Sequence, residues 1–138
     1  MNQVRRIFTG LLTVLVAAAP AATPADSLVG TLEVDRGRPV LKTAAGAVVR
    51  LEGDAATQAV LADVRLHGRR LELVGKALAA DRFEVGPIHL KSMFVLDGGR
   101  RLLISYWCDV CAIRTYTPGK CQCCQEETAL ELRPAEKQ

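Results

Sequence analysis

The sequence predicts a mainly β protein with one short helix and a cysteine-rich segment near the C-terminus. Three observations support this prediction. Short runs of alternating β-forming and polar residues recur along the chain, with turn-forming Gly, Pro and Asp residues between them. Residues 55–63 space their apolar side chains as a helix does. All five cysteines lie between Cys108 and Cys124, which indicates that they serve one local site.

The first half of the chain predicts three strands and the helix. Residues 27–35 form the first strand, and the following Arg-Gly-Arg-Pro turn lets residues 40–43 pair back. A tight Ala-Gly turn then precedes a third strand at 47–51. Asp54 is a typical N-cap for the helix that follows, because its side chain can accept hydrogen bonds from the first backbone N–H groups.

The second half predicts two long strands, at 70–79 and 82–92, with Gly86-Pro87 as a bulge or break in the latter. Three strands, a helix and two strands make the element order of an OB-type barrel. We therefore predict a small OB-like antiparallel barrel as the main domain, residues 27–105. Another small antiparallel sheet packed on one helix is the alternative.

A β-hairpin is predicted to lead the chain from the barrel to the cysteines. An Asp-Gly-Gly-Arg turn between strands at 92–96 and 101–107 is a strong hairpin signal. We expect Tyr106 and Trp107 to pack the cysteine segment against the barrel, because large rings bury much area in one contact. Residues 130–132 can add a last strand.

An apolar run near the N-terminus predicts export. Arg5 and Arg6 precede the apolar residues 7–19, and small residues follow, which is the order of a secretory signal peptide. The run is shorter than the roughly 20 residues that a membrane-spanning helix needs. We therefore expect a signal peptide over 1–22, cleaved near Ala21 or Ala22. The mature chain would be periplasmic or secreted, with no stable membrane anchor.

The charge of the mature chain argues against a nucleic-acid partner. Loss of Arg5 and Arg6 with the signal peptide lowers the formal net charge from +3 to about +1. Binding to nucleic acid relies on clustered Lys and Arg that release counterions from the phosphates. We expect a protein partner instead.

The cysteines form two C-x2-C pairs, Cys108 with Cys111 and Cys121 with Cys124, nine residues apart. Tetrahedral zinc takes four thiolates, and each C-x2-C turn points two sulfurs inward. The Pro-Gly turn before the second pair lets it face the first. The spacing predicts a zinc-ribbon-like metal-binding knuckle with these four ligands and structural zinc. The knuckle spans residues 106–133 and precedes a flexible tail, 134–138.

This segment resembles the short heavy-metal-binding domain of bacterial copper and heavy-metal efflux systems. The matching residues are Cys108, Cys111, Arg114, Pro118, Gly119, Lys120, Cys121 and Cys124. The resemblance implies a metal-binding ribbon and a place among envelope metal-handling proteins. In two respects the sequence departs from that motif: Gln125-Glu126 replaces Gly-Met, and Cys123 is extra. Without the Met, the site lacks a soft thioether that would favour Cu(I).

Two other interpretations of the cysteines stay open. Disulfides form readily in exported proteins, and two of them would leave one thiol unpaired, that of Cys123. Alternatively, the thiols exchange copper or zinc, with Cys123 as an alternative ligand. The protein would then be a disulfide-stapled interaction domain or an envelope metal chaperone or sensor.

No catalytic set and no site for an organic cofactor is predicted. His67 lies in a predicted turn and is expected to be solvated, whereas His89 is expected to pack on a strand. Neither has a neighbouring Ser or Cys arranged for nucleophilic catalysis. The sequence therefore predicts a non-enzymatic binding or assembly module.

Overall fold

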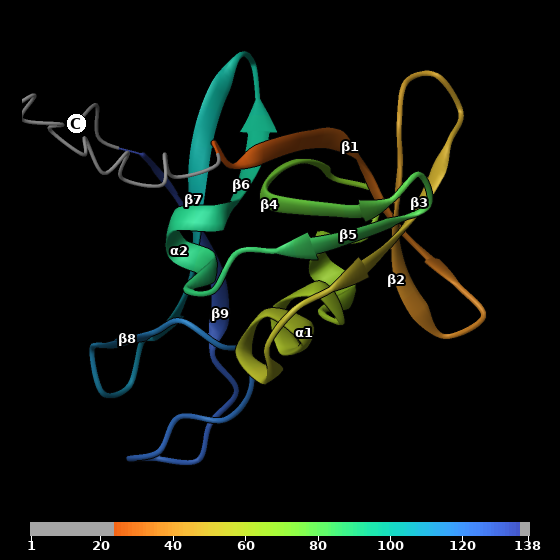
Figure 1. The fold of residues 1–138 in the computed structure, drawn as a ribbon. Coiled ribbons are helices and arrows are strands. Elements are labelled where there is room, and N and C mark those ends of the chain that lie inside the picture. The colour runs from red at the N-terminus through yellow and green to blue at the C-terminus, as the bar shows by residue number, and fades with distance from the viewer. Residues whose placement is uncertain (1–23, 136–138) are drawn as a thin grey trace, which may run out of the picture.

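The computed structural model describes residues 24–135, and the predicted signal peptide and residues 136–138 of the predicted tail lie outside them. Figure 1 shows a mainly β fold whose strands form one continuous sheet that closes on itself. Within residues 24–135, no helix is long and apolar enough to cross a membrane.

Five strands close the barrel that the sequence predicts. β1 pairs with both β2 and β4, β2 continues to β3, and β5 lies between β3 and β4. The β3–β5 pair is parallel, so the prediction of a wholly antiparallel barrel is wrong at this pair. The parallel pair closes the barrel, and the predicted mainly β fold, with a five-stranded barrel and one short helix, is confirmed. The strand bounds are β1 Asp26–Asp35, β2 Arg38–Lys42, β3 Val48–Glu52, β4 Arg70–Ala79 and β5 Arg82–Val85.

The predicted helix lies between β3 and β4. Helix α1 spans Ala55–Leu61, and the Asp54 carboxylate caps it by accepting a hydrogen bond from the Thr57 backbone N–H at 2.8 Å. Its buried face packs into the barrel core. A 3-10 helix, η1 (Val64–Leu66), follows and returns the chain to β4.

The prediction of one long strand over 82–92 is wrong beyond Val85, where β5 ends. Pro87 has no N–H with which to continue the sheet. Ile88 adopts a left-handed conformation, with φ of 63°, and begins the one-turn helix α2 (His89–Ser92). Gly86 permits this turn because a Cβ there would lie 2.7 Å from the Ser92 hydroxyl oxygen.

Four further strands extend the sheet from the barrel to the cysteines. β6 pairs with β4, and β7 pairs with β6, β8 and β9. The predicted hairpin is β6–β7, and the predicted last strand is β9, which runs on through Pro134. Because β7 ends at Cys108, one strand links the barrel directly to the cysteine segment. The bounds are β6 Met93–Asp97, β7 Arg100–Cys108, β8 Ile113–Thr115 and β9 Ala129–Pro134.

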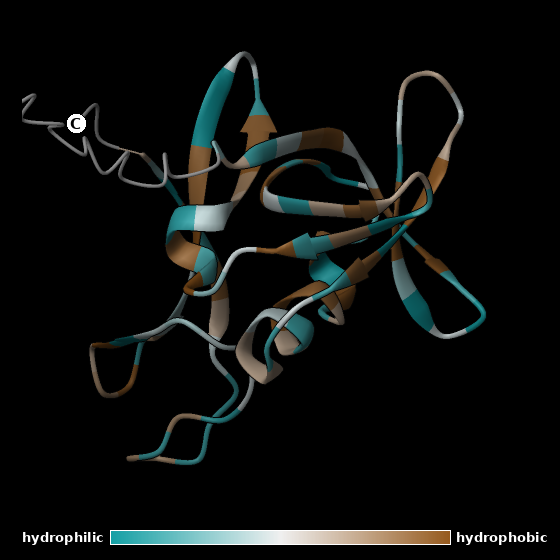
Figure 2. Cartoon of the chain, in the orientation of Figure 1, coloured by the Kyte–Doolittle hydropathy of each residue, from teal (hydrophilic) through white to brown (hydrophobic). Residues whose placement is uncertain are grey.

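The core fills the barrel and continues beneath β7. Figure 2 shows apolar residues alternating with polar ones along the barrel strands. Tyr106 is fully buried in the core cluster, whereas Trp107 on the opposite side of β7 is half-buried. Each large buried side chain contributes about 1.5–3 kcal/mol. Tyr106 thus anchors the strand that carries Cys108.

Candidate metal centre

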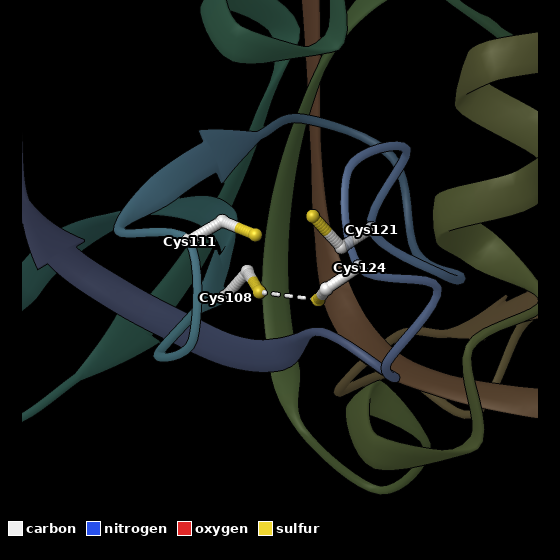
Figure 3. Close-up of side chains that lie close together, drawn as sticks. All are labelled: Cys108, Cys111, Cys121 and Cys124. Carbon is white, nitrogen blue, oxygen red and sulfur yellow. Dashed lines mark hydrogen bonds between the residues drawn. The ribbon is translucent and has the colours of Figure 1, made fainter.

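The sheet brings the four paired cysteines together from two loops. Cys108 ends β7, and Cys111 lies in the turn to β8. Cys121 and Cys124 lie in the loop between β8 and β9. Figure 3 shows their sulfurs facing a common centre. An isolated bridge between Lys120 and Glu127 closes the base of that second loop.

The sulfur positions fit a single tetrahedral ion. All four Sγ atoms lie within 4.8 Å of one another, and those of Cys108 and Cys124 are 3.5 Å apart. A zinc ion with Zn–S bonds of about 2.3 Å places its sulfurs about 3.8 Å apart. The Cys108–Cys124 separation is far above the roughly 2.05 Å of a disulfide, and all five cysteines are free.

Both C-x2-C pairs adopt the same turn. The backbone N–H groups of Val110 and Cys111 are directed to the Cys108 sulfur, and those of Cys123 and Cys124 to the Cys121 sulfur. These N–H groups stabilise negative charge on the first thiol of each pair.

The residue after each pair adopts a left-handed conformation, with φ of 51° at Ala112 and 64° at Gln125. Glycine is the usual residue for this conformation. Because alanine and glutamine stand there instead, sequence reasoning missed the equivalence of the two turns.

The thiols have unequal proton affinities. The N–H groups of Cys124 and Cys123 lower the pKa of Cys121 to about 7. The pKa of Cys111 is raised, chiefly by the neighbouring Cys123 thiol and by burial. At Cys108 the N–H of Cys111 favours the thiolate, but burial and the thiols of Cys124 and Cys121 together raise the pKa. A bound cation would favour deprotonation of every ligand.

Cys123 differs from the other four cysteines. Its side chain is exposed, and it is not one of the four that converge. It nevertheless lies close enough to Cys111 to affect the pKa of that thiol. Neither His67 nor His89 belongs to the cluster. His67 is half-buried, with its Nε2 atom enclosed, so the prediction of a solvated side chain is wrong. His89 is buried, but it lies on helix α2 and not on a strand, so the prediction of a strand position is wrong.

Two side-chain networks fasten the cysteine loops to the rest of the protein. Thr128 donates from both its N–H and its hydroxyl to the Gly119 carbonyl, at 3.0 and 2.7 Å. Arg65 of η1 donates to the Thr128 carbonyl at 2.8 Å. Arg114 of β8 pairs with Glu131 of β9, with Nε and carboxylate oxygen 2.8 Å apart. Sequence reasoning missed these contacts because they join distant parts of the chain.

A pocket of about 380 Å³ lies beside the sulfur cluster. Two of the four cysteines and three acidic residues line it together with apolar residues. The lining residues are Trp107, Cys108, Asp109, Val110, Cys124, Glu126, Glu127 and Ala129.

The donor set fits a borderline-soft cation. Four thiolates in tetrahedral arrangement suit zinc, and soft thiolates also bind Cu(I). The cluster can therefore hold a metal ion. Comparisons with protein-family models, with curated proteins and with solved structures find no significant match.

Proposed function

We propose that this protein is an exported, non-enzymatic binding or assembly module whose cysteine knuckle holds a structural zinc ion. The observation that carries the proposal is the convergence of four thiols, from two turns of the same geometry, within 4.8 Å. The N-terminal sequence pattern supports export.

A structural role is supported by how few buried side chains the loops contain. Between residues 109 and 127, Cys121 is the only buried side chain. A segment without an apolar core needs another source of folding energy. Structural zinc provides an apparent 10–16 kcal/mol, on the order of the whole stability of a domain. The zinc would order the loops and hold them in place on the sheet.

A binding role is supported by apolar side chains on the same loops. Val110 is 71% exposed, and Ile113 and Tyr116 are 41% and 46% exposed. Apolar side chains grouped on a surface are typical of protein interaction sites. The partner in this proposal is another protein.

Native mass spectrometry tests the proposal on protein exported to the periplasm and purified without reductant. One zinc per chain with all thiols intact is the expected result. The Cys121→Ser variant should lose the zinc, whereas the matched Cys123→Ser variant should keep it. A metal-free chain lighter by four hydrogens would contradict the proposal and establish a disulfide-stapled domain. The mature N-terminus in the same spectrum tests export.

A second candidate function is metal exchange, as in an envelope copper or zinc chaperone. The exposed Cys123 beside Cys111 favours it, because a carrier needs an accessible thiol to pass its ion on. Transfer of zinc to a competing chelator distinguishes the two functions. In a carrier, Cys123→Ser would slow transfer, whereas in a structural site the rate would not change.

A further inference from the structure

The pocket described above adjoins one side of the sulfur cluster. Cys108 and Cys124, whose sulfurs are 3.5 Å apart, contribute to the lining of this pocket. Cys111 and Cys121 do not line it. A cation that crosses the pocket therefore reaches the cluster along its Cys108–Cys124 edge.

The pocket also carries a concentration of negative charge. Asp109, Glu126 and Glu127 line it, and all three are exposed. Within residues 24–135 the direct ion pairs of this protein involve other carboxylates, and Glu127 interacts with the Arg65 guanidinium only at longer range. Hard carboxylate oxygens bind divalent cations weakly and release them readily compared with thiolates.

The four converging thiols beside the pocket also point to a cation. Cys108 is only 1% exposed, yet it lines the pocket and belongs to the four converging thiols. The pocket thus leads from acidic side chains at the surface to buried soft ligands. Carboxylates that line a cleft raise the local concentration of cations and speed their association by about 10–1,000-fold.

We propose that this pocket is the loading and exchange route of the metal site, with Asp109, Glu126 and Glu127 as an outer capture site for divalent cations. A cation binds first to the carboxylates and then passes to the Cys108–Cys124 edge. The inference rests on the proposed zinc site. It adds that zinc in this knuckle exchanges through one defined face.

The test uses the zinc-loaded mature protein and Cd²⁺ as the probe. Cd²⁺ displaces zinc from thiolates, and the cadmium–thiolate absorbance reports the exchange in a stopped-flow instrument. The test variant replaces all three carboxylates, as Asp109→Asn, Glu126→Gln and Glu127→Gln. The control variant removes the same charge elsewhere, as Glu33→Gln, Asp35→Asn and Asp97→Asn. Figure 1 shows the β1–β2 and β6–β7 turns far from the loops around β8.

We expect an exchange rate that rises with Cd²⁺ concentration and falls about 10-fold in the test variant at low ionic strength. The control variant should stay within about 2-fold of the wild type. The difference should vanish near 1 M salt, where the Debye length is about 3 Å.

Three results would overturn the route: equal rates in test variant and wild type, equal slowing in the control, or a rate independent of Cd²⁺ concentration. A test variant that binds no zinc would also overturn it, because the carboxylates would then support the fold. If the wild-type protein carries no zinc and yields no cadmium–thiolate absorbance, the proposed zinc site itself fails, which is a separate outcome.

Discussion

The Arg65 guanidinium donates a hydrogen bond of 2.8 Å to the backbone carbonyl of Thr128, although 63 positions separate the two residues. The same guanidinium forms a two-pronged ion pair with the Asp63 carboxylate, through Nε and Nη2 at 2.8–3.1 Å. The Asp63 side chain is buried, and Thr128 is also buried. This contact joins η1, at the base of the barrel, to the loop that carries the second cysteine pair.

Replacement of Arg65 by Met should therefore loosen the cysteine loop and lower the free energy of unfolding by about 1–3 kcal/mol. The change leaves Asp63 and the Thr128 carbonyl without their charged donor. The Arg65 side chain is 38% exposed, so the loss should be smaller than the 3–5 kcal/mol of a fully buried pair. Chemical denaturation measures this loss in the free energy of unfolding.

Arg50→Met is the matched control for that measurement. Arg50 pairs with Asp81 on the surface, where the two side chains are 53% and 63% exposed. An exposed pair contributes about 0–1 kcal/mol. Equal losses in the two variants would show that Arg65 acts as an ordinary surface residue.

The pKa of Asp63 predicts an acid dependence of stability. Burial acts to raise this pKa, but hydrogen bonds from the Arg65 side chain and backbone outweigh it, and the net shift is downward. A lowered pKa in the folded state stabilises the fold above the unfolded pKa, about 3.9. That stabilisation is lost as the pH falls below this value.

The Asp63→Asn variant isolates this contribution, because both proteins share every other titrating group. The variant should be less stable than the wild type by about 1–3 kcal/mol at pH 7. The difference should shrink as the pH falls below about 4. A difference independent of pH, measured by denaturation across this range, would show that the charge of Asp63 does not matter.

The two left-handed residues beside the cysteine pairs offer a stabilising change. At φ of 51° and 64°, Ala112 and Gln125 carry a conformational cost of about 1–2 kcal/mol that glycine avoids. Ala112→Gly and Gln125→Gly should each raise the free energy of unfolding of the zinc-loaded protein by about 0.5–1 kcal/mol, after the entropy of glycine in the unfolded chain is counted. Thermal denaturation provides the measurement.

Ala62→Gly serves as the control for these substitutions. Ala62 is exposed at the end of α1 and has right-handed backbone angles, φ of −80° and ψ of −10°. Glycine should therefore destabilise the protein there, by about 0.5–1 kcal/mol. If all three glycine variants are less stable than the wild type, the left-handed residues at the two cysteine turns are not strained.

The sequence predicted what local patterns encode. Alternation located most strands, Asp54 marked the start of α1, and the cysteine spacing identified the four thiols that converge. Local patterns marked a bulge or break at Gly86-Pro87, directly after the end of β5, but they did not show the helical turn α2 beyond it, because the sequence is β-forming on both sides of Pro87. They also did not show the parallel β3–β5 pair or the contact of Arg65 with Thr128. Such long-range contacts depend on how the whole chain folds.

Metal removal should separate the stability of the loops from that of the barrel. The barrel core consists of apolar side chains such as Leu32 and Leu71, both fully buried, and does not depend on the cysteines. The loop between β8 and β9 relies instead on hydrogen bonds from the Cys121, Gln125 and Thr128 N–H groups. We expect a chelator to abolish hydrogen-exchange protection at these three amides while the Leu32 amide stays protected. The physical reason is that local opening costs little where few apolar contacts resist it. Loss of protection in both regions together would instead mean that zinc holds the whole fold, with β7 transmitting its effect to the barrel.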